Sequence, residues 1–305
     1  MSTAVSVDIQ TYLQEKREWL DLHLPRFVPQ SENPAIAQLL DAMNYSLSAG
    51  GKRIRPLLML ASAEAFGERH EHLLPSMVAI EMIHTYSLIH DDLPSMDNDD
   101  LRRGMLTSHK KYGEATAILA GDALMTYAYE VVVRYTDRSL VNAKTILQVV
   151  QEIGQATGVF GMVGGQMMDL YHEKEAGDGR GEIVREIHQR KTGALIRSSI
   201  RIGAMLMQAT QLQLDQLSIF ANHLGLAFQI VDDILDETGT AEELGKNPGS
   251  DKAKSKLTYP AVFGLERSRA MAQEQGELAL EALEHFNGSA SVLRALTQHV
   301  IERRS

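Results

Sequence analysis

The sequence predicts an all-α protein, and three observations support that expectation. Apolar residues recur with helical spacing through almost every segment of the 305 residues. Helix-start and helix-stop signals such as Asn33-Pro34 and Gly67 separate these segments. The apolar/polar alternation typical of strands is scarce. Because no linker-like stretch divides the chain, residues 1–305 are expected to form one domain.

The expected helices follow one another along the whole chain. The second begins after the N-cap Asn33 and is closed by Gly50 and Gly51, and the helix leading to Asp92 is broken by Pro94. The expected spans are 8–24, 34–49, 54–66, 73–92, 114–135, 139–172, 182–207, 212–236 and a C-terminal group from Pro260 to about Arg303. Residues 173–181 and the polar stretch 237–257 are expected to be loops, the second of them mobile.

The span 139–172 carries four glycines at helical spacing. They are Gly154, Gly158, Gly161 and Gly165. Each glycine costs up to about 1 kcal/mol in a helix, so a stripe of them predicts close approach by another helix or room for a ligand.

Composition excludes several function classes. The chain has no cysteine, which excludes disulfides, thiolate catalysis and zinc–thiolate sites. The formal net charge of -10 argues against a general nucleic-acid or anionic-membrane surface. The N-terminal residues lack a basic region followed by an apolar one, and we expect no apolar run long enough to span a membrane. A cytoplasmic protein without a membrane span is therefore expected.

The chain is organised around an acidic stretch, SLIHDDLPSMD at residues 87–97, which continues through Asp99 and Asp100 to Arg102 and Arg103. Carboxylates this dense repel one another unless they are solvated or hold a hard cation such as Mg²⁺. Guanidinium groups match phosphate oxygens, so the arginine pair suggests a phosphorylated substrate. Taken alone, this cluster fits a solvated charged loop about equally well.

A second acidic cluster favours the metal interpretation. Gln229, Asp232, Asp233 and Asp236 fall in one sector of a helix at about 100° per residue, and apolar residues fill the adjoining sector. One side of this helix can enter a core while its neighbour faces a cavity. A surface helix would more often carry charges of both signs in i,i+4 pairs.

Together these motifs resemble the trans-isoprenyl diphosphate synthase family, in particular its bacterial farnesyl diphosphate synthases. The first aspartate-rich motif is matched by residues 91–97 in the bacterial form with two extra residues, and the second by residues 232–236. GGKRIRP at residues 50–56 matches the block that precedes them, and the likeness runs from about Gly50 to Pro260. One departure is Leu106, which stands where the family usually has proline.

The resemblance implies a fold, a reaction and a cofactor. The fold would be the isoprenoid-synthase helical bundle around a central cavity. The reaction would join dimethylallyl or geranyl diphosphate to isopentenyl diphosphate and give (2E,6E)-farnesyl diphosphate. Mg²⁺, with three ions in the family and Mn²⁺ as a possible substitute, would neutralise the departing diphosphate. That diphosphate would also take the proton, so no side-chain base is assigned. The family usually forms homodimers.

The resemblance also implies the metal ligands. Asp91 and Asp97 match the ligands of two ions and Asp232 the ligand of the third, with Asp92 and Asp236 as further ligands.

The remaining matched positions bind the two diphosphates, and Lys191 is also assigned a catalytic role. The isopentenyl diphosphate positions are Lys52, Arg55, His84 and Arg103. The allylic diphosphate positions are Arg102, Lys191, Thr192, Gln229, Lys246 and Lys256. His84 also shares a helix face with Ser87 and Asp91, although a histidine on an apolar helix is more often a core residue. Each lysine alone would more often be a solvated surface charge.

Product length is assigned by resemblance to Tyr86, with Ser87 after it. In the bacterial family an aromatic residue five positions before the first aspartate helps to form the floor of the pocket, and a bulky floor implies a fifteen-carbon product. On an ideal helix Tyr86 points about 140° away from Asp91, so geometry alone would leave it an ordinary core tyrosine.

Four other interpretations are open at this point. A related synthase could make geranyl or geranylgeranyl diphosphate. A terpene cyclase would need Ser/Thr and Glu where Asp236 and Thr240 stand. An HD-type metal-dependent phosphohydrolase could use His84, His90 and Asp91, but it leaves the second cluster unexplained. A non-catalytic partner subunit would tend to lose one of the aspartate motifs, and this chain keeps both.

Overall fold

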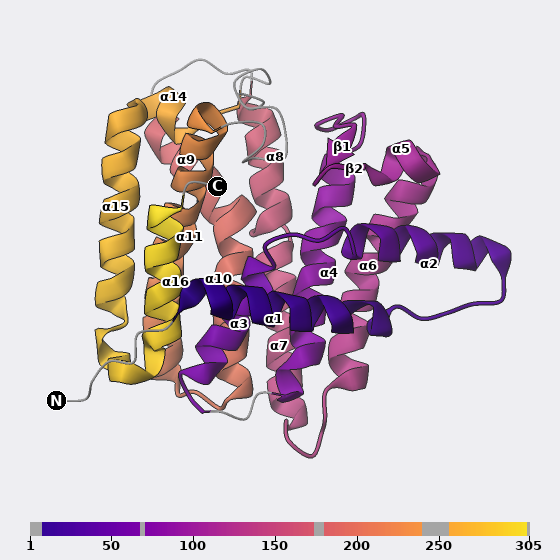
Figure 1. Ribbon diagram of the computed structural model, residues 1–305, viewed down its shortest axis with the longest axis horizontal. Coiled ribbons are helices and arrows are strands. Elements are labelled where there is room, and N and C mark those ends of the chain that lie inside the picture. The colour runs from indigo at the N-terminus through magenta and orange to yellow at the C-terminus, as the bar shows by residue number, and fades with distance from the viewer. Residues whose placement is uncertain (1–7, 68–70, 174–179, 240–255, 304–305) are drawn as a thin grey trace. The chain divides into compact units, whose positions relative to one another are not determined.

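The structure is a computed structural model, and it describes residues 8–67, 71–173, 180–239 and 256–303 (Figure 1). These residues form an almost entirely helical protein, which confirms the predicted fold class. The α-helices are α1 Ile9–His23, α2 Pro34–Leu47, α3 Ile54–Glu64, α4 Leu74–Asp91, α5 Ser108–Tyr112, α6 Glu114–Tyr135, α7 Ala143–Thr157, α8 Met162–His172, α9 Arg180–His188, α10 Ala194–Leu206, α11 Gln211–Thr238, α14 Tyr259–Phe263, α15 Leu265–Ala282 and α16 Ser291–Glu302. Short 3₁₀ helices span Leu24–Phe27, Glu71–Leu73 and Glu284–Ala290.

The chain divides into two compact units, and the boundaries between them fall within α1, α3 and α7 and immediately before Glu71. The N-terminal unit comprises Gln10–Leu57 and Glu71–Val150. The C-terminal unit comprises Met1–Ile9, Leu58–His70 and Gln151–Ser305. The first aspartate motif belongs to the N-terminal unit and the second to the C-terminal unit.

In the N-terminal unit, α4 and α6 pack along each other. Apart from its last turns, α4 is buried, with residues such as Val78, Ile80 and Ile83 fully covered. The length and composition of α6 would also suit a membrane-spanning helix, contrary to the expectation that no run is long enough. Core helices meet the same criterion, and α6 lies against α4, α2 and α5, so this is only weak evidence for a membrane span.

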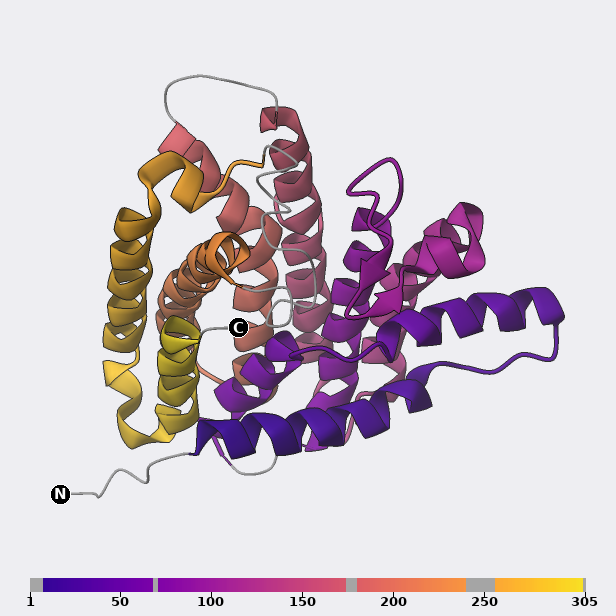
Figure 2. The same ribbon diagram turned by 45° about the horizontal axis from the view of Figure 1, so that its top comes forward.

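In the C-terminal unit, α11 is the central helix. It packs against α10 and α15 and also contacts α16, and Figures 1 and 2 both show α16 beside it. A capping box in which Thr210 and Gln213 satisfy each other's backbone amides begins α11. Leu217, Ala221 and Leu224, which belong to the apolar sector predicted for this helix, are buried, so that sector does enter a core.

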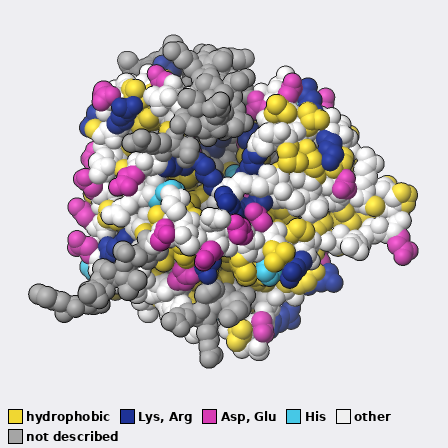
Figure 3. Space-filling model, in the orientation of Figure 1, with side chains coloured by type: hydrophobic (Ala, Val, Ile, Leu, Met, Phe, Trp, Pro, Cys, Tyr) yellow, Lys and Arg dark blue, Asp and Glu magenta, His cyan; other side chains and the backbone are white. Residues whose placement is uncertain are grey.

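Three details differ from the expected helices. The span 139–172 is two helices, because the chain turns at residues 158–161 between α7 and α8. A π-helix, Gln189–Gly193, connects α9 to α10 within the span expected to be one helix. Two-residue strands, β1 Leu101–Arg102 and β2 Met105–Leu106, form an antiparallel hairpin with Arg102 paired to Met105. Figure 3 shows apolar side chains gathered on the surface over this hairpin and α5.

Candidate active site

The first aspartate cluster lies at the carboxyl end of α4. The amide of Asp97 donates a 2.8 Å hydrogen bond to the carbonyl of Asp91, and the amide of Asn98 donates one of 3.0 Å to Leu93. The chain after the helix therefore folds back and brings Asp97 beside Asp91. The negative end of the helix dipole disfavours carboxylates here and favours a cation.

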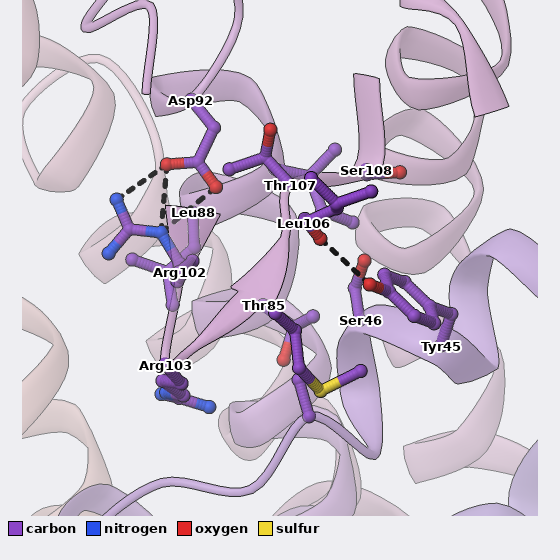
Figure 4. Close-up of a pocket in the computed structure, with 13 residues that line it drawn as sticks. Tyr45, Ser46, Thr85, Leu88, Asp92, Arg102, Arg103, Leu106, Thr107 and Ser108 are labelled. Atoms are coloured by element: carbon purple, nitrogen blue, oxygen red, sulfur yellow. Dashed lines mark hydrogen bonds and ion pairs between the residues drawn. The ribbon is translucent and has the colours of Figure 1, made fainter. Parts of the chain in front are cut away.

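Asp92 does not share the exposure of Asp91. Its carboxylate forms a bidentate ion pair with Arg102, at 2.8 and 2.9 Å from Nε and 2.5 Å from Nη2 (Figure 4). The side chain of Asp92 is only 4% exposed. Burial raises the pKa of this carboxyl group, and Arg102 opposes that effect. The cavity beside the pair is about 30 Å³, far too small for a prenyl diphosphate.

The hairpin fixes the two arginines. Arg103 and Gly104 have φ values of 55° and 76°, as a two-residue hairpin turn of the primed type requires. Arg103 donates a hydrogen bond to the carbonyl of Gly50. A Cβ on Gly51 would lie 2.6 Å from both terminal nitrogens of Arg103, so Gly51 lets that guanidinium approach the backbone. Leu106 contributes its carbonyl, which accepts a 2.8 Å bond from the Tyr45 hydroxyl.

His84 lies where several predicted substrate ligands converge. Burial is the main reason that its pKa is well below the ordinary 6.5, and the positive charges of Arg55, Arg103, Arg102 and Arg53 add to it. The imidazole is therefore neutral at physiological pH. Four of the predicted diphosphate ligands therefore lie close enough to interact electrostatically. They are His84, Arg55, Arg102 and Arg103.

Arg53, which was given no role from the sequence, is a structural residue. Its guanidinium is buried and binds Asp21 at 2.8 Å, Glu81 at 2.5 Å and the carbonyl of Leu47 at 2.8 Å. Buried charges are stable only with such complete pairing. The neighbouring Lys52 is exposed.

Tyr86 is buried on α4 and 5% exposed. Its ring meets the ring of His90 edge-on at 5.8 Å, and burial is the main cause that raises the pKa of its hydroxyl group. His90 in turn lies against α6, with Nε2 3.1 Å from the carbonyl of Ile118. Ser87 donates a hydrogen bond to the carbonyl of His84 at 2.9 Å. Tyr86 therefore belongs to a packed layer between α4 and α6.

The second aspartate cluster occupies the last two turns of α11. Asp232 is the most exposed of the three, with 39% of its side chain accessible, and it is bound by Arg303 at 2.5 Å. Asp236 is buried. Like the first cluster, this one lies at the negative end of a helix dipole.

Asp233 is an anchor within the protein. Its Oδ2 lies 2.8 Å from Nε2 of His188 and accepts a 2.9 Å bond from the amide of Tyr259, while its Oδ1 accepts a 3.1 Å bond from Gln229. The rings of His188 and Tyr259 stack at 5.4 Å. The carboxylate thus ties α11 to α9 and to the start of α14.

The predicted lysine and threonine pair lies on the π-helix. Lys191 donates a 2.6 Å hydrogen bond to Asp169 on α8, and Thr192 donates one of 2.8 Å to Gln229. A Cβ on Gly165 would overlap the backbone of Lys191, at 2.7 Å from its Cα. This glycine of the predicted stripe therefore permits a close approach between α8 and the π-helix. Single π-turns inside helices are frequent at functional sites.

Two predicted lysines fall at the edge of the described chain. Lys256 is described and half-buried, whereas Lys246 lies outside the described residues, as does most of the loop predicted at 237–257. Asp169, His188, Tyr259 and Arg303 were not singled out from the sequence. None belongs to a motif, and each contacts a predicted site residue that is distant from it in the sequence.

The donor set of the clusters consists of hard carboxylate oxygens. Within the described residues, no three metal-ligating side chains gather in one group. Mg²⁺ keeps several waters and needs only one or two carboxylates besides substrate oxygens, so the pair Asp91 and Asp97, or Asp232 with substrate, fits that ion.

The described part of the chain is thus an all-α protein whose acidic helix ends have arginine or lysine partners, a combination suited to a phosphorylated substrate. Residues 36–299 match the family model for polyprenyl synthetase. The chain belongs to the polyprenyl synthetase family, and it is a prenyltransferase of isoprenoid biosynthesis.

Similar proteins of this family differ in product. The chain is 44% identical to farnesyl diphosphate synthase of Geobacillus stearothermophilus, over 97% of each chain. It is 43% identical to geranylgeranyl diphosphate synthase of Cyanophora paradoxa, over 98% of this chain and 97% of that one. The crystal structure of a FPP/GFPP synthase from Zymomonas mobilis matches with a TM-score of 0.85 and 35% identity, covering 97% of this chain and all of that one. These relatives support the reaction class and leave the product length open.

Proposed function

We propose that this prenyltransferase is a farnesyl diphosphate synthase, which adds isopentenyl diphosphate to dimethylallyl and then geranyl diphosphate. The observation that carries the proposal is the neighbourhood of His84, where Arg55, Arg102 and Arg103 lie close enough to lower the pKa of a half-buried imidazole near the acidic end of α4. Such a group of arginines suits the diphosphate common to both substrates.

In this proposal the chain's residues bind and orient, and Mg²⁺ supplies charge neutralisation for the leaving diphosphate. Asp91, Asp97 and Asp232 would hold the metal, with Asp92 and Asp236 as further ligands. Arg102, Lys191, Thr192, Gln229, Lys246 and Lys256 would hold the allylic diphosphate, and Lys52, Arg55, His84 and Arg103 the isopentenyl diphosphate.

The allylic C–O bond breaks, and its electron pair leaves with the diphosphate. The double bond of isopentenyl diphosphate forms the new C–C bond, and the proton that is then lost goes to the departing diphosphate. Charges fixed before the reaction stabilise the transition state without reorganisation. The described residues therefore need to supply no nucleophile, in agreement with the absence of cysteine.

The buried ring of Tyr86 supports a fifteen-carbon limit. A bulky residue held between α4 and α6 by His90 can close a pocket by steric exclusion. A geranylgeranyl diphosphate synthase is the second candidate, because relatives with that product are equally similar. The phosphohydrolase alternative loses its support, since the chain belongs to a prenyltransferase family and His90 Nε2 lies against a backbone carbonyl.

The test is product analysis. Purified protein is incubated with dimethylallyl diphosphate, isopentenyl diphosphate and Mg²⁺, with a chelator control, and the products are separated by chain length. Metal-dependent farnesyl diphosphate is expected. A twenty-carbon product would retain the mechanism and refute the role of Tyr86, and condensation that survives the chelator would refute the metal assignment.

We also propose a homodimer. Leu119 on α6 and Leu147 on α7 are 57% and 68% exposed in the N-terminal unit, and such side chains favour burial against a second copy. Light scattering after size-exclusion chromatography should give twice the chain mass of 33.8 kDa. A monomer at micromolar concentration would contradict this proposal.

A further inference from the structure

The residue that follows α16, Arg303, reaches back to the second aspartate cluster. Its Nη2 donates hydrogen bonds to Asp232 Oδ1 at 2.5 Å and to the carbonyl of Phe228 at 2.9 Å. Its guanidinium carbon lies 4.1 Å from the centre of the Phe228 ring, within the range of a cation–π contact. Three interactions of different kinds thus hold one side chain against α11.

The burial of this arginine is unusual for a residue beyond the last helix. Its side chain is 4% exposed, whereas the Asp232 side chain that it binds is 39% exposed. Its Nε is buried without a hydrogen-bond partner among the described residues. Taking a guanidinium out of water has a large desolvation cost, which only close pairing offsets. The pair with Asp232 is therefore what keeps Arg303 in this position.

The carboxylate itself also needs a cation. Asp232 lies near the carboxyl end of α11, and Asp233 and Asp236 follow it within one turn or so. The helix dipole and the neighbouring carboxylates both disfavour its negative charge. Either a guanidinium or a divalent cation can balance the negative charge of Asp232, and here the guanidinium of Arg303 is bound at Oδ1.

We propose that Arg303 is the resident counter-ion of Asp232, and that a divalent cation must displace it in order to bind there. This inference rests on the proposed assignment of Asp232 as a metal ligand. Displacement removes the pairing that offsets the burial of the guanidinium, so Arg303 leaves α11 when the metal is bound. Arg303 is thus a positioning residue that couples the end of α16 to the metal occupancy of α11. The coupling is reciprocal, because whatever holds Arg303 in place weakens metal binding equally.

The test is a Mn²⁺ titration of the full chain, with free ion measured by electron paramagnetic resonance. Arg303→Gln removes the competing charge and should tighten binding by about tenfold, the equivalent of one charge-assisted hydrogen bond. Asp232→Asn should weaken binding. Arg294→Gln is the matched control, because Arg294 is also part-buried on α16 but donates to the carbonyls of Leu280 and Leu283, and its loss should leave Mn²⁺ affinity unchanged.

The outcomes separate the two proposals. If Asp232→Asn weakens Mn²⁺ binding while Arg303→Gln binds as the wild type does, the metal assignment stands and the displacement is refuted. If Asp232→Asn binds Mn²⁺ as the wild type does, the metal assignment fails, and the displacement fails with it. If Arg303→Gln and Arg294→Gln both bind Mn²⁺ more tightly than the wild type does, a specific role for Arg303 is also refuted.

Unfolding in chelator gives a second measurement that does not depend on metal affinity. Arg303→Gln and Asp232→Asn should each lower the urea midpoint, and the double variant should fall no further than the lower single one. With saturating Mn²⁺ the effect of Arg303→Gln should disappear. Additive losses in chelator, or an unchanged loss with Mn²⁺, would overturn the inference.

Discussion

Replacement of Asp92 by alanine should destabilise the protein, whereas replacement of its neighbour Asp91 should not. Asp92 is 4% exposed and accepts three contacts from Arg102 within 2.9 Å. Removing one partner of a buried ion pair costs roughly 3–5 kcal/mol. The Arg102 side chain is 32% exposed, and water can solvate it once the partner is gone, so we expect a loss of about 2 kcal/mol.

Asp91 provides the contrast within the same motif. It is only half-buried, and it is the last residue of α4, where the helix dipole disfavours a carboxylate. Asp91→Ala should change the free energy of unfolding by less than about 0.5 kcal/mol, in the range of surface substitutions. It should nevertheless nearly abolish turnover, because the proposed metal loses a ligand.

Urea unfolding followed by circular dichroism at 222 nm measures both variants against the wild type. Arg102→Ala should cost more than Asp92→Ala, because it leaves the 4% exposed carboxylate of Asp92 without its counter-ion, whereas Asp92→Ala leaves a guanidinium that water can reach. The double variant should be far from additive, because all three changes remove the same pair. A change below about 0.5 kcal/mol in Asp92→Ala, or additive losses in the double variant, would refute the structural role assigned to this carboxylate.

The remaining predictions concern three other positions. Because the pKa of His84 in the folded protein is well below 6.5, the unfolded chain binds a proton at this histidine first as the pH falls. The free energy of unfolding should therefore decrease below about pH 6.5, by up to about 1.4 kcal/mol per pH unit. His84→Asn should lack this contribution when urea midpoints are compared at pH 7.5 and 5.5, and the same pH dependence in the variant as in the wild type would contradict the prediction. Gly165→Ala should displace the backbone of Lys191 and lower both the melting temperature and turnover, whereas Gly288→Ala, with no atom within 4 Å of the new methyl, should leave both unchanged. Tyr86→Ala should lengthen the product in the chain-length assay, and unchanged fifteen-carbon output would remove its assignment.

Helix positions could be predicted where local chemistry decides them. The side chain of Asn33 accepts hydrogen bonds from the amides of Ala35 and Ile36, as its N-cap signal implied, and α6 has the expected bounds. The break at residues 158–161 was missed because glycines within an apolar periodic run also fit a continuous helix. The π-helix and the two-residue strands leave too short a pattern to detect, since neither completes one period of apolar alternation.

The site could be predicted only in part for a related reason. The aspartates were found because their spacing along one helix is a local property. Their partners His188, Tyr259 and Arg303 lie 26 to 71 residues from the carboxylates they bind, so only the packing of α11 against other elements selects them. Asp169 is likewise 22 residues from Lys191. The sequence-derived roles of the site residues stay predictions until the variants are measured.

The two adjacent aspartate pairs, Asp91-Asp92 and Asp232-Asp233, show the same difference between their first and second members. Adjacent residues on a helix point about 100° apart, so when one carboxylate faces the protein its neighbour faces outward. The second members, Asp92 and Asp233, are 4% and 3% exposed and fully engaged by protein donors, whereas Asp91 and Asp232 are more exposed. An adjacent pair thus supplies one anchor that fixes the helix end, and in the proposed metal site its neighbour would supply an oxygen ligand that this anchor orients. A metal role for Asp92 would require Arg102 to move away, so variants at the second position should lose stability first and variants at the first position should lose metal binding first.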